Sequence, residues 1–225
     1  MTNSARYHRV VAIDGPAASG KSSVARELAE RIGFVYVNSG AMYRAVTWHV
    51  LNRGIDANDR AAIEKLADEM HFDCDLDGRA SRVVVEGIDP TPHLRDAGVN
   101  ENVSLVSSVP HVREVLVEKM RSYAVSNDVV MEGRDIGSVV FPETPFKFYI
   151  DASPEIRSQR RAAQGEMDAI AARDEADSSR STAPLMIAPD AEVIDSSSKS
   201  IAKVVDHILE RMQAQGFNTS AVAAS

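Results

Sequence analysis

Residues 15–22 read GPAASGKS, with RVVAID (residues 9–14) before them and SVARELAERIG (residues 23–33) after them. RVVAID has the apolar character of a short buried strand. Apolar side chains then recur at helical spacing as far as Gly33, a residue type that favours the end of a helix. The stretch therefore predicts a strand, a glycine-rich turn and a helix in direct succession, which is one unit of an α/β fold.

The glycine-rich turn matches GxxxxGK[ST], which forms a phosphate-binding loop (P-loop) when a strand precedes it and a helix follows it. Gly15 and Gly20 permit backbone conformations that turn several N–H groups toward one point, and the helix adds its positive N-terminus. We expect ATP to bind here, with Lys21 at its β- and γ-phosphates and the Ser22 hydroxyl on Mg²⁺. The expected ATP contacts are Gly15, Pro16, Ala17, Ala18, Ser19, Gly20, Lys21, Ser22 and Ser23.

The composition excludes several partners. The chain has 25 Lys and Arg against 33 Asp and Glu, a formal net charge of −8, so we expect no nucleic-acid binding. No apolar run is long enough for a membrane span, and the first nine residues lack the apolar region of a signal peptide. A cytoplasmic monomer that does not bind membranes is expected. The single cysteine, Cys74, alternates with Phe72 and Leu76 and is expected to be a buried strand residue.

Strands and helices continue to alternate along the chain, with one interruption. Further strands are predicted at residues 34–37, 129–131, 146–150 and 191–195. In the interruption, residues 72–76 and 82–86 alternate with period two around an Asp-Gly pair, which is typical of a hairpin. A helix capped by Asp59 precedes that hairpin.

These patterns predict an α/β fold with a five-stranded parallel sheet flanked by helices, a small α+β insertion and a lid. The predicted core comprises residues 1–59, 109–163 and 183–225, the insertion comprises residues 60–108, and the polar lid comprises residues 164–182.

Two further motifs follow strand ends and indicate a second substrate. NSGAMYR (residues 38–44) opens a helix after the second strand, and EGRD (residues 132–135) follows the strand VVM. Ligands of doubly wound sheets gather at the carboxyl ends of the strands, and arginine can bind phosphate with two parallel hydrogen bonds. Ser39, Arg44 and Arg134 are therefore candidates for binding the phosphate of an acceptor.

The P-loop alone leaves several functional classes open. The guanine-reading NKxD motif of GTPases is absent, and the chain is too short to carry a helicase or motor apparatus. A kinase for a small acceptor remains, as does a nucleotide-binding regulatory module without turnover.

Five stretches, spread over nearly the whole chain, resemble the bacterial cytidylate (CMP) kinase family. They are IDGPAASGKSS (13–23), NSGAMYRAV (38–46), SSVPHVR (107–113), EGRDIGSVVFP (132–142) and RDEADSSRSTAPL (173–185). The resemblance implies the fold of a P-loop nucleoside-monophosphate kinase, with an enlarged substrate domain and an arginine-bearing lid. It also implies phosphoryl transfer from ATP with Mg²⁺ to CMP and dCMP.

The resemblance assigns roles to individual residues. It places Ser39, Arg44 and Arg134 at the acceptor phosphate, Ser104, Arg113 and Asp135 at the cytosine edge, and Arg173, Asp177 and Arg180 in the lid. Lys21, Arg134, Asp135 and Arg180 are the residues expected to act in catalysis.

The sequence departs from the family pattern at two places. Asn38 stands where the family usually carries an acid, and only eleven residues separate Arg161 from Arg173, which is shorter than usual. Glu132 has two possible roles, because a carboxylate at a strand end can organise a magnesium-bound water or serve the structure alone.

Overall fold

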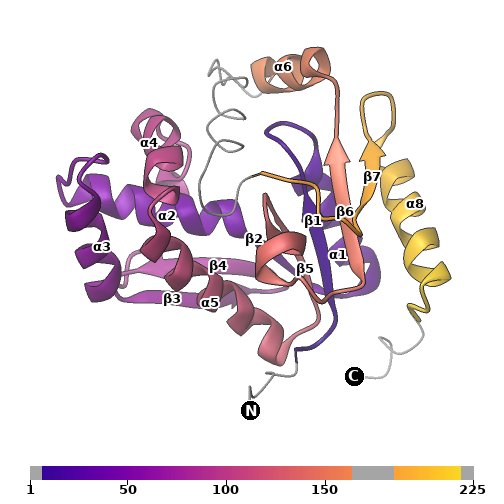
Figure 1. The fold of residues 1–225 in the computed structure, drawn as a ribbon, viewed down its shortest axis with the longest axis horizontal. Helices are drawn as coiled ribbons and strands as arrows, with labels where there is room; N and C mark the ends of the chain where they lie inside the picture. The colour runs from indigo at the N-terminus through magenta and orange to yellow at the C-terminus, as the bar shows by residue number, and fades with distance from the viewer. Residues whose placement is uncertain (1–6, 164–184, 219–225) are drawn as a thin grey trace.

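The computed structural model describes residues 7–163 and 185–218. Within these described ranges, seven strands form one sheet in the order β3-β4-β2-β5-β1-β6-β7 (Figure 1). Their bounds are β1 Val10–Asp14, β2 Val35–Asn38, β3 Phe72–Asp77, β4 Ala80–Val85, β5 Val129–Gly133, β6 Phe146–Asp151 and β7 Glu192–Asp195.

The predicted five-stranded parallel sheet was wrong in its number of strands. The strands β2, β5, β1, β6 and β7 are parallel as expected, but the hairpin β3–β4 extends the same sheet. The Tyr36 N–H donates to the carbonyl of Arg79 at 2.8 Å, and the Asn38 N–H donates to the Ser81 hydroxyl at 3.2 Å. The edge of β2 thus pairs with strand β4 of the hairpin. Local sequence patterns do not reveal this pairing between distant segments.

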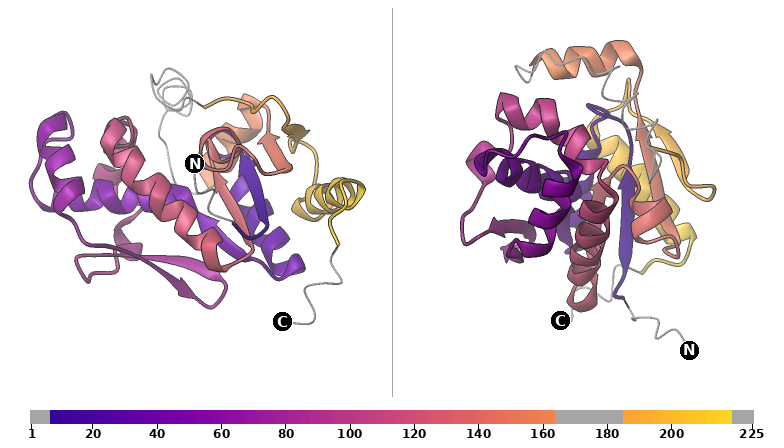
Figure 2. Two further views of the ribbon diagram at one scale, coloured as in Figure 1. Left: turned by 60° about the horizontal axis from the view of Figure 1, so that its bottom comes forward. Right: turned by 60° about the vertical axis from the view of Figure 1, so that its left-hand side comes forward.

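Helices cover both faces of the sheet, and Figure 2 shows α5 and α8 on opposite sides of the central strands. The helices of the described residues are α1 Lys21–Ile32, α2 Ser39–Asn52, α3 Arg60–Glu69, α4 Ala97–Ser107, α5 Pro110–Ser126, α6 Pro154–Ala163 and α8 Ile201–Ala214. Two short elements complete them: a 3₁₀ turn, η1, at Thr91–His93 and a π-helical turn, η2, at Ile136–Val140. None of these helices has the length and apolar character needed to cross a membrane.

Each central strand contributes to two apolar cores because its side chains alternate between the two faces. Val10 and Ala12 face the core that contains α2, α3 and α5, whereas Val11 and Ile13 face the core that contains α1 and α8. All four side chains are buried, as expected for a parallel strand covered on both sides. The apolar run that predicted β1 is therefore explained by burial on both faces.

The edge strand β3 is less buried than its alternation suggested. Phe72 is buried, Cys74 is half-buried and Leu76 is exposed. Burial raises the pKa of the Cys74 thiol, which disfavours the thiolate that a nucleophilic cysteine needs. The progressive exposure reflects the position of β3 at the end of the sheet.

Two predicted helix starts have the expected capping geometry. The Asp59 side chain accepts a hydrogen bond from the Ala62 N–H at 3.1 Å at the start of α3. Asn38 caps α2 in the same way, with its side-chain oxygen accepting from the Ala41 N–H at 3.0 Å. Helix α2 thus begins directly at the carboxyl end of β2, where NSGAMYR was expected to meet a substrate.

Candidate functional site

The P-loop joins the end of β1 to the start of α1. Gly15 has φ +152°, and a Cβ atom there would lie 2.1 Å from the carbonyl oxygen of Ile150, so no side chain fits. Gly20 precedes α1 with φ +92° and provides no side-chain cap to the helix. The N-terminus of α1 therefore adjoins the P-loop, an arrangement that favours the binding of an anion.

Cationic side chains donate hydrogen bonds to backbone carbonyl oxygens of this loop. Arg134 donates to the Gly15 carbonyl at 2.6 Å, and Lys21 donates to the Pro16 carbonyl at 3.1 Å. Two arginines of α6 complete the set: Arg157 donates to Ala17 O at 3.3 Å, and Arg160 donates to Ser19 O at 3.0 Å. The loop is therefore bordered by positive charge, which favours a phosphate in its concave side.

Sequence reasoning missed Arg157 and Arg160. Helix α6 begins beyond the carboxyl end of β6, the same edge of the sheet that carries the P-loop (Figure 1). The two arginines are three positions apart and so share one face of α6. Two arginines at this spacing, on a helix that begins at the ligand-binding edge of the sheet, are the sequence feature that could have identified them.

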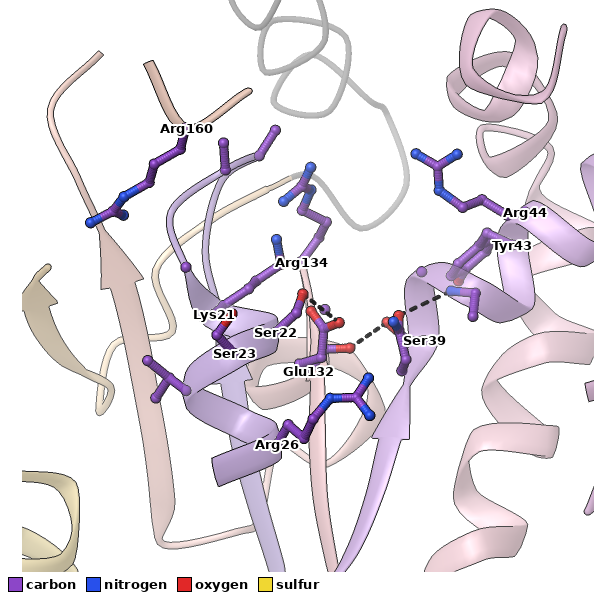
Figure 3. Close-up of a pocket in the computed structure, with 18 of the residues that line it drawn as sticks. Lys21, Ser22, Ser23, Arg26, Ser39, Tyr43, Arg44, Glu132, Arg134 and Arg160 are labelled. Atoms are coloured by element: carbon purple, nitrogen blue, oxygen red, sulfur yellow. Dashed lines mark hydrogen bonds between the residues drawn. The ribbon is translucent and has the colours of Figure 1, made fainter. Parts of the chain in front are cut away.

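The carboxylate of Glu132 lies beneath the P-loop helix at the end of β5. It accepts a hydrogen bond from the Ser22 hydroxyl at 2.8 Å (Figure 3). It also accepts one from the Tyr36 hydroxyl at 3.2 Å. Burial, with the Glu132 charge as a second cause, raises the pKa of Tyr36 well above its usual range. Tyr36 therefore remains a hydrogen-bond donor, and the Glu132 carboxylate is held beside Ser22.

Across the cavity, Arg113 and Asp135 form a buried ion pair, with each side chain 4% exposed. Arg113 also donates to the carbonyl of Ser107 at 3.3 Å, and its guanidinium lies 5.3 Å from the centre of the Tyr43 ring. An ion pair this deeply buried is stable only when both charges are present, because either one alone is poorly solvated.

Two predicted acceptor ligands have defined partners. Arg44 donates to the carbonyl of Leu94 at 2.7 Å and to the side-chain oxygen of Asn100 at 2.6 Å. Ser39 donates from its hydroxyl to the backbone carbonyl of Glu132 at 2.7 Å. These contacts fix the start of α2 against β5 and orient Arg44 toward the 3₁₀ turn and α4.

A cavity of about 1220 Å³ connects the P-loop with the residues around the Arg113–Asp135 ion pair. Of the predicted residues it is lined by Ala17, Ala18, Gly20, Lys21, Ser22, Ser23, Ser39, Arg44, Ser104, Arg113, Arg134 and Asp135. Gly15, Pro16 and Ser19 are not part of its wall. Arg173, Asp177 and Arg180 lie outside the described residues.

The charge of the cavity is opposite to that of the molecule. Among the described residues, ten lysines and arginines line it against four acids, whereas the whole chain carries a formal charge of −8. Figure 3 shows Arg134 between the P-loop side, with Lys21 and Ser22, and the Arg44 side of the cavity. The arrangement suits two anionic groups that meet near Arg134.

Asp14 is a buried acid next to this cavity. Its two carboxylate oxygens accept hydrogen bonds from the N–H groups of Ile136 and Gly137, each at 2.8 Å. Burial raises the pKa of Asp14 to about 7, and nearby Asp135 adds to the rise, while the two N–H groups and Lys21 oppose it. The buried position thus favours the protonated carboxyl group more than water does.

The raised pKa predicts a pH-dependent contribution of Asp14 to stability. Because the folded-state pKa lies above the unfolded one, stability from this group is present at low pH and is lost as pH rises through 7. Relative to Asp14→Asn, the wild type should gain about 2–3 kcal/mol in unfolding free energy between pH 8 and pH 5. Urea denaturation of both proteins at the two pH values measures it, and a difference independent of pH would contradict the raised pKa.

The P-loop and the cationic cavity beside it define a P-loop phosphotransferase with space for a second anionic substrate. Residues 11–214 match the family model described as Cytidylate kinase. The chain belongs to the cytidylate kinase family, and it is an enzyme of the nucleoside-monophosphate kinase class.

Named relatives agree with this assignment. The chain is 44% identical over 217 residues to the cytidylate kinase of Pelotomaculum thermopropionicum, covering 91% of this chain and 96% of that protein. It is 40% identical over 217 residues to the cytidylate kinase of Corynebacterium glutamicum, covering 91% and 94%. The crystal structure of TT1252 from Thermus thermophilus covers 95% of this chain and 100% of its own, with 17% identity and a TM-score of 0.48. That structural likeness adds nothing to the family assignment.

Proposed function

We propose that this enzyme phosphorylates CMP and dCMP to CDP and dCDP, using ATP with Mg²⁺ in an in-line phosphoryl transfer. The observation that carries the proposal is the single cavity that joins the P-loop to the buried Arg113–Asp135 pair. The P-loop side of the cavity has the chemistry to bind a triphosphate, and the side with the Arg113–Asp135 pair has the chemistry to recognise a polar base.

Cytosine recognition would use the ion pair and Ser104. Cytosine presents a 4-amino donor beside two acceptors, N3 and O2, so it pairs with a carboxylate on one side and a cationic donor on the other. Asp135 supplies the acceptor and Arg113 the donor, and their pairing holds both in place. Uracil would turn its O4 acceptor toward the Asp135 carboxylate, so UMP should be disfavoured.

Phosphoryl transfer would rest on charge stabilisation by the side chains that border the P-loop. Lys21 would contact the transferred phosphoryl group, and Arg134, between the two halves of the cavity, would contact the phosphates of both substrates. Ser39 and Arg44 would hold the acceptor phosphate near the start of α2. Asp135 would have a secondary catalytic role beside its contact with the base.

The residues near Ser22 fit a magnesium ion. Mg²⁺ in kinases keeps several water molecules and takes few protein ligands besides the phosphates. The Ser22 hydroxyl would be the direct ligand, and the Glu132 carboxylate 2.8 Å from it could hold a magnesium-bound water. When bound, the ion neutralises charge on the transferred phosphate.

The proposed domain bounds rest on the sequence patterns, and the roles of the lid residues rest on the family resemblance. We propose residues 60–108 as the CMP-binding insertion between core segments 1–59 and 109–163, with 183–225 as the last core segment. Arg173, Asp177 and Arg180 of the proposed lid, residues 164–182, would close over the phosphates and contact the sugar.

An acceptor panel tests the proposal directly. ADP release, followed in a coupled assay with CMP, dCMP, UMP, AMP and GMP, should depend on CMP or dCMP. The kcat/KM for UMP should be about 10- to 100-fold lower than for CMP, because its O4 faces a carboxylate. Equal turnover with all five acceptors, or with none of them, would reject the assignment. Tight ATP binding without transfer to any acceptor would favour the regulatory module instead.

A further inference from the structure

Asp14 connects the P-loop to the segment that carries Arg134 and Asp135. It is the last residue of β1 and directly precedes Gly15. Its side chain is only 6% exposed. Strand β5 pairs with β1 in a register that sets Asp14 beside Gly133, so the turn after β5 begins next to this carboxylate.

Both oxygens of the carboxylate bind that turn. The N–H groups of Ile136 and Gly137, at the start of η2, each donate to one oxygen at 2.8 Å. At Gly137 a Cβ atom would lie 3.3 Å from Asp14 Oδ2 and 3.2 Å from carbons of the Lys147 side chain, so glycine gives the turn room to approach. These two donors come directly after Arg134 and Asp135 in the chain.

A second contact links the same two segments. The Arg134 guanidinium donates to the Gly15 carbonyl at 2.6 Å, one residue beyond Asp14. The donor loop and the turn carrying the proposed acceptor ligands are therefore connected twice, once by backbone N–H groups and once by a side chain. Such fixed geometry between two reacting groups is a large source of catalytic rate.

We propose that Asp14 is a positioning residue, which holds Arg134 and Asp135 in place relative to the P-loop so that acceptor and donor phosphates meet in line. The inference rests on the proposed function for the identity of the acceptor. A carboxylate suits this role because it accepts two N–H groups at once, one on each oxygen. An asparagine of the same shape accepts on one oxygen only and turns N–H groups toward the second donor.

The test is the variant Asp14→Asn, assayed with CMP and ATP at pH 8, where the Asp14 carboxyl group is mostly ionised. We expect kcat to fall about 100-fold, because small displacements of positioned groups have effects of that size, and the KM for CMP to rise. The Kd for ATP, measured by titration calorimetry, should stay within about threefold, because the Asp14 carboxylate accepts its hydrogen bonds from Ile136 and Gly137 and acts on Lys21 through its charge alone.

The matched control is Thr144→Val. Thr144 is buried, and its hydroxyl donates to the carbonyl of Val10 at the opposite end of the same strand. This variant should lower the melting temperature without changing kcat. A loss of stability alone would affect the two variants alike, so equal kinetic effects in both would overturn the proposal, as would wild-type kcat and KM in Asp14→Asn.

Amide hydrogen exchange separates this inference from the proposed function. Exchange at Ile136 and Gly137 should be faster in Asp14→Asn than in the wild type, whatever the acceptor is. Unchanged exchange overturns the inference, whereas a wild type inactive with CMP counts against the proposed function alone. If Asp14→Asn does not fold, Gly137→Ala replaces it, because the added methyl group presses on the Asp14 carboxylate. Wild-type kinetics and exchange in that variant would also overturn the proposal.

Discussion

The variant Lys21→Met is expected to lower kcat about 1000-fold, because it removes a charge that would act on the transferred phosphoryl group. Lys21 is the first residue of α1 and lines the cavity. Methionine has a similar length and good helix propensity, so α1 should still form. Steady-state kinetics with CMP and ATP measure the loss, and thermal unfolding checks that the fold is kept.

The control is Lys65→Met, which removes the same charge from an exposed position on α3, where the lysine side chain is 75% exposed. Its kcat should equal that of the wild type. If Lys21→Met kept its activity, the P-loop would not be the site of phosphoryl transfer. A loss in both variants would point to the net charge of the chain instead of the position of Lys21.

Arg113→Met should affect both recognition and stability. It removes the Arg113 guanidinium from the Asp135 carboxylate, which is 4% exposed. Breaking a buried ion pair in this way costs about 3–5 kcal/mol of unfolding free energy. The KM for CMP should rise about 100-fold through loss of a charged hydrogen bond to the base, while the KM for ATP should change little. Urea denaturation and steady-state kinetics measure the two effects.

The double variant Arg113→Met with Asp135→Asn separates these effects. Stability should largely return, because the buried charge that lost the Arg113 guanidinium is gone, but the KM for CMP should stay high. Lys119→Met on the same helix serves as the control, since its ammonium group donates to the Phe72 carbonyl and does not line the cavity. An unchanged KM for CMP in Arg113→Met would favour a kinase for an acceptor without a base.

The P-loop could be predicted from sequence because its determinants are local. Gly15 and Gly20 have positive φ angles, and the strand before them and the helix after them follow from short-range periodicity. The side of the cavity opposite the P-loop depends on contacts between distant residues. Arg113 and Asp135 are separated by 22 positions, and their ion pair follows from no local pattern. The resemblance identified both residues, and the structure adds that they contact each other.

The sequence patterns failed where pairing depends on the tertiary fold. The hairpin β3–β4 was predicted, but nothing in residues 72–86 indicates that β4 lies beside β2. The sequence patterns identify Asp14 only as the end of a strand. Its hydrogen bonds with the N–H groups of Ile136 and Gly137 form only in the tertiary fold. The structure also gives Asn38 a definite place, since it caps α2 with its side-chain oxygen.

The excess of positive side chains in the cavity has a consequence for the rate at which substrates arrive. A negatively charged surface with a positive interior concentrates field lines at the mouth of the cavity. Small phosphorylated metabolites that diffuse close to that opening are drawn inward, while long polyanions also meet the repelling exterior. Dissolved ions shorten the range of this attraction to roughly 8 Å at physiological ionic strength, so the field acts on a substrate only over this last part of its approach.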